Sequence, residues 1–185
     1  VQGKKGWKTG TSVADVNGDG LLDIYVCYSG LETEEGRANQ LFINKGNGAN
    51  KVPKFVDEAA AYGLDAKGSY STQAVFFDYD LDGDLDMFLL NHSKTFYSPF
   101  YNSTKLRNTR HPFFGNSLYR NDGNNFVDVS ESAGIYGSGL NFGLGVSISD
   151  FNQDGWPDIY VSNDYDEQDF LYINKGDGTF LDSSK

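Results

Sequence analysis

Residues that support redox or zinc chemistry are scarce in this sequence. Its 185 residues include one cysteine, Cys27, and two histidines, His92 and His111. A single cysteine excludes an internal disulfide, and its place inside the apolar run 24–28 indicates a buried, unreactive thiol. Neither histidine belongs to a recognisable motif, so we predict no catalytic residues, although composition alone leaves a Ser-His-Asp arrangement open.

Long apolar runs and positive charge are scarce as well. No stretch approaches the roughly 18 apolar residues that a membrane span requires. Lys and Arg number 15 against 26 Asp and Glu, which gives a formal net charge of −11. Because this charge repels phosphate backbones, we expect no nucleic-acid partner. The chain also shows no signal peptide and opens with Val1, which indicates a processed or excised piece of a longer protein.

Aromatic and turn-forming residues, in contrast, are abundant. The chain has 14 Phe, 12 Tyr and 22 Gly. Aromatic side chains favour strands, and glycines favour the tight turns between strands. The composition therefore predicts an all-β fold, and the length is sufficient for one domain with its own core.

A repeat with several parts organises the whole chain. Three nine-residue segments align without gaps at 15–23, 78–86 and 150–158. Each begins and ends with aspartate and has glycine at its sixth position. A strand-like stretch precedes each segment and an apolar run follows it. We call these segments the Asp loops and number their positions 1 to 9.

A second block of each repeat lies further along the chain. The pattern Leu-x-x-Asn occurs at 41–44, 118–121 and 171–174, and a Gly-rich turn and a Phe-x-Asp stretch follow each time. Each repeat therefore reads as strand, Asp loop, strand, loop, strand, Gly turn, strand, which is one blade of a β-propeller. We predict three four-stranded antiparallel repeats, at about 7–64, 65–135 and 136–185, in one propeller segment.

The Asp loops have the composition of calcium sites. Ca²⁺ takes roughly six to eight oxygens, and side chains at positions 1, 3, 5 and 9 can surround one ion together with a carbonyl near position 7. The glycine at position 6 permits the sharp turn that this requires. The sequence therefore predicts three Ca²⁺ sites. The predicted ligands are Asp15, Asn17, Asp19 and Asp23; Asp78, Asp80, Asp82 and Asp86; and Asp150, Asn152, Asp154 and Asp158.

Other readings of the Asp loops explain less. A plain Asp/Asn/Gly turn accounts for one loop, but not for three that each gather carboxylates which repel one another without a cation. An EF-hand requires a glutamate at position 12, where this chain has Val26, Leu89 and Val161 in strand-like runs. Mg²⁺ rarely takes so many protein oxygens, and zinc prefers His or Cys ligands.

The Asp loops, the Asn-x-Gly turns at 44–46 and 174–176 and the Phe-x-Asp stretches resemble the FG-GAP/VCBS repeat family. That family includes the propellers of integrin α-subunits and many bacterial surface proteins. The resemblance covers about residues 7–183, and 143–164 looks most like exported bacterial proteins that carry an ASPIC/UnbV-type module, which is absent here. It implies Asp loops that join the first two strands of each blade and bind Ca²⁺ structurally. It also implies partner binding on the face opposite the calcium loops.

Three blades are fewer than the four or more of a closed propeller. An open arc leaves exposed edge strands. We expect that the rest of a larger propeller belongs to sequence beyond this chain; completion of the arc by a partner chain is the alternative.

One connection is much longer than its equivalents. From the Asp loop to the Leu-x-x-Asn block the chain takes 40 residues in the second repeat (78 to 118), but 26 and 21 in the first and third (15 to 41 and 150 to 171). Aromatic residues and arginines in the extra stretch are typical of interfaces, so we interpret it as a candidate surface for a protein or glycan partner. Packing over the neighbouring blade or into the central channel is the alternative. The candidate partner-binding residues are Phe96, Tyr97, Tyr101, Arg107, Arg110 and Phe113.

Together these features predict a non-enzymatic, extracytoplasmic, calcium-binding propeller segment that serves cell-surface adhesion or ligand binding. Sites with the affinity of extracellular calcium modules stay empty in the cytosol and begin to fill outside the cell. The alternative is a polysaccharide-active enzyme built on a calcium propeller, which an acid/base group around His92 or His111 would favour.

Overall fold

The structure is a computed structural model that describes residues 1–31, 33–95, 103–123, 125–165 and 167–183. Its strands form three four-stranded antiparallel sheets, and within each sheet neighbouring strands are consecutive in the chain. This confirms the predicted all-β fold with three four-stranded repeats. We call each sheet a blade.

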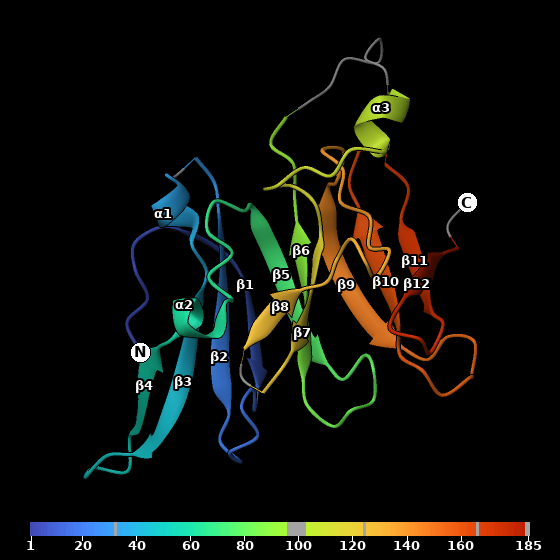
Figure 1. The fold of residues 1–185 in the computed structure, drawn as a ribbon. Coiled ribbons are helices and arrows are strands. Elements are labelled where there is room, and N and C mark those ends of the chain that lie inside the picture. The colour runs from blue at the N-terminus through green and yellow to red at the C-terminus, as the bar shows by residue number, and fades with distance from the viewer. Residues whose placement is uncertain (32, 96–102, 124, 166, 184–185) are drawn as a thin grey trace.

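Figure 1 shows the three blades in chain order from blue to red. The first blade contains β1 (Trp7–Ala14), β2 (Asp23–Ser29), β3 (Gln40–Asn47) and β4 (Pro53–Asp57). The second contains β5 (Ser71–Phe77), β6 (Asp86–Asn91), β7 (Ser117–Asn121) and β8 (Phe126–Asp128). The third contains β9 (Gly143–Ser149), β10 (Asp158–Asn163), β11 (Phe170–Asn174) and β12 (Phe180–Asp182).

Short helices lie in the connections that the sequence described only as loops and linkers. They are α1 (Glu34–Arg37), α2 (Ala59–Tyr62) and α3 (Ser103–Arg107). Helix α2 ends at Gly63, whose left-handed backbone, with φ of 76°, turns the chain toward the second blade. Within the described residues, no helix has the length and apolar character needed to cross a membrane.

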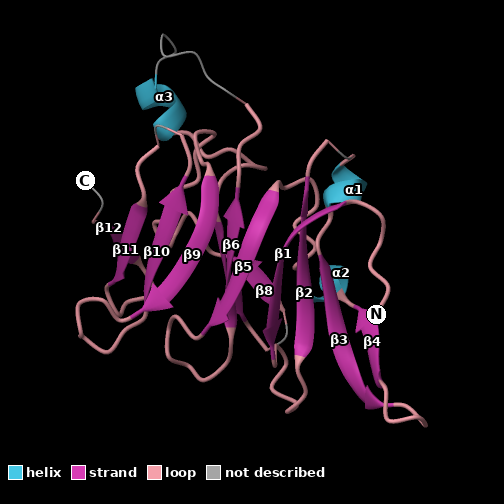
Figure 2. Cartoon of the chain, turned by 180° about the vertical axis from the view of Figure 1, so that it is seen from behind, coloured by secondary structure: helices cyan, strands magenta, loops and turns pink. Residues whose placement is uncertain are grey.

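The blades pack face to face, with their first strands side by side. β1 contacts β5 and β5 contacts β9, as Figure 2 shows. The backbones come very close there, because a Cβ on Gly10 would lie 2.3 Å from the carbonyl oxygen of Thr72. Glycine at position 10 therefore permits the contact between β1 and β5.

Two apolar layers hold the blades together. The layer between the first and second blades joins Tyr25 and Leu41 to Met87 and Leu89. The layer between the second and third blades has its own cluster, which includes Phe88, Leu118, Ile159, Phe170 and Tyr172. Every residue of β6 is buried, because the second blade is covered on both faces. The sheets form an open arc rather than a closed ring (Figures 1 and 2).

Candidate calcium centres

The three Asp loops lie at one end of the blades. They join β1 to β2, β5 to β6 and β9 to β10, and all project from the lower edge in Figure 1. Helices α1 and α3 lie at the opposite end, where the second and third strands of the first and second blades are connected. The chain therefore separates the acidic loops from its longest connection.

The aspartate at position 1 shapes each Asp loop. Oδ1 of Asp15 accepts the backbone N–H of Asp19 at 3.0 Å, and Oδ2 accepts that of Gly20 at 2.7 Å. Asp78 makes the same two bonds at 3.1 and 3.0 Å, and Asp150 at 3.1 and 2.9 Å. Each carboxylate oxygen has a second lone pair, so these bonds leave acceptor capacity for a cation. Two backbone N–H groups of each loop therefore bind the carboxylate at position 1, and the loop curves around this carboxylate.

Two positions of each loop require a left-handed backbone. At position 6, Gly20, Gly83 and Gly155 have φ of 84°, 101° and 94°. This confirms that the loop turns sharply at its glycine. Position 4 is also left-handed, and there the second and third loops carry Leu81 and Gln153, with φ of 57° and 63°. Side chains with a Cβ are strained in this region.

The aspartate at position 9 fastens each loop to the blade. Asp23, Asp86 and Asp158 are completely buried. Oδ2 accepts the backbone N–H of the position 2 residue at 3.0, 3.0 and 2.9 Å respectively. Oδ1 accepts the backbone N–H of the asparagine in the Leu-x-x-Asn block at 2.8, 2.9 and 2.8 Å. The ninth position therefore connects the loop to the third strand of its blade.

The asparagine of the Leu-x-x-Asn block is a functional residue that the sequence analysis did not assign. The side-chain amides of Asn44, Asn121 and Asn174 each donate to the carbonyl at position 8 of the Asp loop, at 3.2 Å. The side-chain oxygens of Asn44 and Asn174 also accept a backbone N–H from the Gly turn at 3.0 Å. The recurrence of the block was the available signal, but the role of its asparagine depends on contacts across 17 to 36 residues of chain.

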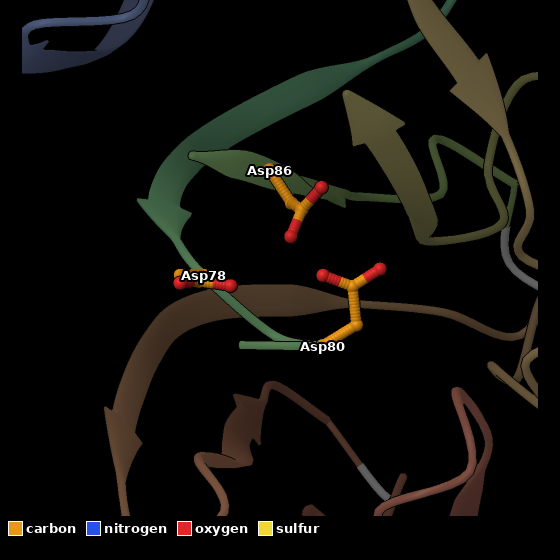
Figure 3. Close-up of side chains that lie close together, drawn as sticks. All are labelled: Asp78, Asp80 and Asp86. Atoms are coloured by element: carbon orange, nitrogen blue, oxygen red, sulfur yellow. The ribbon is translucent and has the colours of Figure 1, made fainter. Parts of the chain in front are cut away.

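The second Asp loop brings three carboxylates into one cluster. One oxygen each of Asp78, Asp80 and Asp86 lies within 4.8 Å of the others, and Figure 3 shows the three side chains directed toward a common space. Oδ1 of Asp80 is buried and has no hydrogen-bond partner among the described residues. Oxygen ligands at this spacing, with one buried and unsatisfied, fit a hard cation such as Ca²⁺.

Asp84, at position 7 of the second loop, was not predicted as a ligand. Its Oδ1 is likewise buried without a hydrogen-bond partner in the described part of the chain. From the sequence we expected only a backbone carbonyl near this position. The strict alternation of aspartates from 78 to 86 was a visible signal for a more acidic site.

The electrostatics of the second loop reflect the crowding of its carboxylates. The pKa of Asp86 is raised to about 7, chiefly by burial and also by the charges of Asp80 and Asp84, against two opposing backbone N–H bonds. Burial also raises the pKa of Asp80, with Asp82 and Asp78 acting in the same direction. A divalent cation in the cluster would favour the ionised carboxylates and reverse these shifts.

The first and third loops carry an amide at position 3. The side-chain amides of Asn17 and Asn152 donate to Oδ2 of the aspartate at position 5, at 3.1 and 2.8 Å. In these loops the predicted ligands therefore contact one another directly. The third loop is the most open, because Asp150 and Asn152 are exposed while Asp15 and Asn17 are half-buried.

The long connection of the second blade packs over the third blade. Arg107 forms an ion pair with the buried Glu167. Arg110 donates to the carbonyl of Asn116 at 2.7 Å and makes a bridge contact with Ser138. Three predicted partner-binding residues, Phe96, Tyr97 and Tyr101, lie outside the described residues. Arg107 and Arg110 are thus used for contacts within the chain, as the packing alternative requires, and partner binding stays a prediction.

Phe113 belongs to the same connection but lies toward the first blade. Its ring fits against Gly68, where a Cβ would lie 2.7 Å from the ring. Its carbonyl accepts the backbone N–H of Tyr70 at 3.1 Å. This predicted partner-binding residue is therefore half-buried at a junction between blades.

The two histidines face backbone groups and rings. Nδ1 of His111 accepts the backbone N–H groups of Phe113 and Phe114 at 3.2 Å each, and its ring stacks on Phe114 at 4.0 Å. Nδ1 of His92 lies 2.7 Å from the carbonyl oxygen of Ser93. The enzymatic alternative, which an acid/base group around either histidine would favour, stays a prediction.

Comparison with known proteins agrees with the repeat pattern. A family profile described as the FG-GAP-like repeat matches residues 15–89, 106–161 and 150–185. A search of curated proteins gave no significant match. The matched segments contain all three Asp loops, whereas the finer likeness to exported bacterial proteins with ASPIC/UnbV-type modules stays a prediction. Because the match extends over most of its length, the chain belongs to the FG-GAP-like repeat family.

Proposed function

We propose that this chain is a calcium-binding segment of a β-propeller whose structural ions hold the three Asp loops in place. The observation that carries the proposal is the cluster of Asp78, Asp80 and Asp86, whose oxygens lie within 4.8 Å of one another. Carboxylates at this distance repel one another unless a cation lies between them. The buried, unsatisfied Oδ1 of Asp80 supports the same conclusion.

In this proposal the four predicted positions of each Asp loop hold one Ca²⁺. Bound calcium supplies positive charge that cancels the repulsion between the carboxylates. Three ions change the formal net charge from −11 to −5, since each adds two positive charges. The chain's own contribution is to hold the ligands in place, through the backbone N–H groups that bind positions 1 and 9.

The proposed location is extracytoplasmic: secreted, cell-surface or periplasmic. Extracellular calcium modules have dissociation constants on the order of 10⁻⁴–10⁻³ M, which suits calcium levels outside the cell. The proposed activity is non-enzymatic, with adhesion or binding of a protein or glycan as the function. The end of the blades opposite the Asp loops is the candidate binding surface, because the described part of the long connection, with helix α3, lies there.

Calcium titration and thermal unfolding test the central proposal. Isothermal titration calorimetry should show three Ca²⁺ bound per chain. A chelator should lower the melting temperature, because ions that bind only the folded state stabilise it by about 2.7 kcal/mol per site at 100 times the dissociation constant. Added Ca²⁺ should restore the melting temperature more effectively than Mg²⁺.

One triple variant removes a predicted ligand from each Asp loop, and a second triple variant serves as its control. Asp19→Ala, Asp82→Ala and Asp154→Ala change exposed side chains, so they remove calcium ligands without removing buried packing. Each also deletes a hydrogen bond from the backbone N–H of position 7, so calcium uptake and not stability alone is compared. The control variant Glu34→Ala, Glu131→Ala and Asp177→Ala removes three exposed carboxylates outside the loops. The proposal fails if chelation leaves the melting curve unmoved, or if both variants bind calcium equally.

A further inference from the structure

Two asparagines of this chain are followed directly by glycine, which makes them candidates for spontaneous deamidation. Asn17-Gly18 occupies positions 3 and 4 of the first Asp loop, and Asn47-Gly48 lies where β3 ends. Glycine has no Cβ to shield its backbone nitrogen from the preceding side chain, and asparagine is a thermolabile residue type. The two steps are equally prone to the reaction by sequence, so the fold determines which of them reacts.

Deamidation uses the backbone nitrogen of the following residue as a nucleophile. In the first loop, the nitrogen of Gly18 bonds to Cγ of Asn17, and Nδ2 leaves as ammonia with the proton of the Gly18 N–H. Water then opens either C–N bond of the resulting five-membered succinimide and gives aspartate or isoaspartate. The net reaction exchanges ammonia for water. An N–H that donates a hydrogen bond within the fold must be released before this reaction can start.

The step at the end of β3 has its glycine N–H bound. The backbone N–H of Gly48 donates to the carbonyl of Val52 at 2.9 Å. The turn is closed a second time, because the N–H of Lys51 donates to the carbonyl of Gly48 at 3.0 Å. Asn47 is more exposed than Asn17, yet its reaction requires this turn to open.

The step in the first Asp loop has its glycine N–H open. Gly18 is exposed and left-handed, with φ of 69°, and no residue in the described ranges accepts a hydrogen bond from its N–H. A Cβ at Gly18 would meet no atom within 4 Å, so the space around it is free as well. The side chain of Asn17 is held by Asp19 instead: its Oδ1 accepts the backbone N–H and its Nδ2 donates to Oδ2, each at 3.1 Å.

The other steps of the Asp loops are protected in two ways. At position 6 the N–H groups of Gly20, Gly83 and Gly155 donate to the aspartate at position 1, at 2.7, 3.0 and 2.9 Å. These bonds protect the Asp-Gly steps, which can form the same succinimide. In the third loop Asn152 is followed by Gln153, whose side chain hinders ring closure.

We propose that Asn17 is a self-modification site, which deamidates through Gly18 when the first Asp loop is free of calcium and is protected when the loop holds the ion. The protection rests on the proposed function, because it requires Ca²⁺ in the first loop. The choice of Asn17 over Asn47 does not. An ion held by Asn17 fixes its side chain and the loop backbone together, and the ring cannot close until the side chain is released.

Deamidation changes the calcium chemistry of the first loop permanently. With aspartate at position 17, the loop has carboxylates at all four predicted ligand positions, as the second loop does. Ligand charge raises calcium affinity, so this product tightens the site. Isoaspartate instead adds a carbon atom to the main chain between positions 3 and 4, which displaces the ligands and weakens the site. A period without calcium thus leaves a lasting mark on this loop.

Peptide mapping by mass spectrometry tests the choice of site. The chain is incubated at pH 8 with excess Ca²⁺ or with a chelator, and conversion of Asn17, Asn47 and Asn152 is measured in the same digest. With the chelator, Asn17 should convert at least about tenfold faster than either of the others, and calcium should slow it at least about tenfold. In concentrated urea Asn17 and Asn47 should convert equally, because only the fold distinguishes them.

Chelation is also expected to destabilise the fold, so an empty first loop is compared in a calcium-loaded chain. In excess Ca²⁺, Asp19→Ala should let Asn17 convert, while the matched variant Asp154→Ala should leave it slow. A swap at position 4 identifies the nucleophile. Gly18→Gln should stop conversion of Asn17 and Gln153→Gly should start conversion of Asn152, since both positions have similar φ, 69° and 63°.

Three results overturn the proposal. The first is conversion of Asn47 as fast as Asn17 in the Asp19→Ala chain. The second is an Asn17 that stays intact both in that variant and with the chelator. The third is equal conversion of Asn17 with and without Ca²⁺ although calorimetry shows that the first loop binds the ion. If calorimetry shows no uptake by this loop, the proposed function and the protection both fail, whereas faster conversion of Asn17 than of Asn47 still supports the site.

Discussion

The backbone N–H of Asn174 donates a 2.8 Å hydrogen bond to Oδ1 of Asp158, which joins the third strand of the third blade to the last position of its Asp loop. The side chain of Asn174 adds further bonds. Its amide donates to the carbonyls of Tyr79 and Pro157 at 2.8 and 3.2 Å, and its oxygen accepts from Gly176 at 3.0 Å. One residue thereby connects an Asp loop, a Gly turn and the neighbouring blade.

Asn174→Ala should therefore destabilise the protein. The substitution leaves buried carbonyls without their donor, which costs about 1–3 kcal/mol. It should also weaken calcium binding by the third loop, because the carbonyl at position 8 loses its anchor. Urea denaturation measures the first effect and calorimetry the second. Asn108→Ala, at an exposed site, is the control and should change stability by less than about 0.5 kcal/mol. Equal stability of the two variants would contradict this role.

Gln153→Gly should stabilise the third loop. Gln153 is exposed and has a left-handed backbone, with φ of 63°, at the position where the first loop has Gly18 with φ of 69°. Left-handed geometry costs a residue with a Cβ about 1–2 kcal/mol, and the greater freedom of glycine in the unfolded chain offsets part of the gain. We expect a net gain of about 0.5–1 kcal/mol in urea denaturation.

The reverse substitution, Gly18→Gln, supplies the control for this prediction. It should lower stability by a similar amount, since a Cβ at Gly18 meets no atom within 4 Å and steric overlap is not involved. If both variants change stability in the same direction, backbone strain at position 4 is not the cause.

The order of the strands within each blade could be predicted from the sequence, because the signals for it lie close together in the chain. Strand patterns and turns recur three times around the Asp loops, and each strand pairs with its neighbour in the chain. The three-carboxylate cluster of the second loop was predictable for the same reason, since Asp78, Asp80 and Asp86 lie within nine residues of one another.

Contacts between distant segments could not be predicted in this way. Arg107 and Glu167 are 60 residues apart, and neither has a local feature that identifies the other as its partner. The amide of Asn174 reaches Tyr79 across 95 residues for the same reason. The exposure of Phe151 also could not be predicted from the sequence pattern, because it depends on which segments pack against the third blade and not on the loop itself.

Stability should depend on pH through His111. Burial lowers the pKa of His111 below its usual value near 6.5, and its Nδ1 accepts two backbone N–H groups that a protonated ring would lose. In the pH range between the lowered pKa and the usual pKa, His111 is therefore protonated in the unfolded chain but not in the folded chain. This contribution is present above about pH 6.5 and is lost as the pH falls from there toward the folded pKa.

His111→Phe tests this dependence, because phenylalanine keeps a ring to stack on Phe114 but does not titrate. Urea denaturation in excess calcium at pH 7.5 and 5.5 should show a larger loss for the wild type than for the variant. Titration of the Asp loops affects both proteins alike and cancels in the comparison. Equal losses would show that His111 does not control stability in this range.

The second Asp loop should fill with calcium before the others. It has carboxylates at all four predicted ligand positions, whereas the first and third loops have three carboxylates and an amide. Ligand charge raises calcium affinity. The buried, unsatisfied oxygens of Asp80 and Asp84 add to the free energy gained when a cation binds.

Variants with one intact loop measure this order directly. Asp19→Ala with Asp154→Ala leaves the second loop, and Asp82→Ala with Asp154→Ala leaves the first. Calorimetry at pH 8, above the pKa of Asp86 at about 7, avoids competition from protons. The second loop should bind more tightly, and Asp80→Asn should reduce its advantage. Asn17→Asp should strengthen the first loop, because it restores a fourth carboxylate. If the first loop binds as tightly as the second before this change, ligand charge does not set the order of filling.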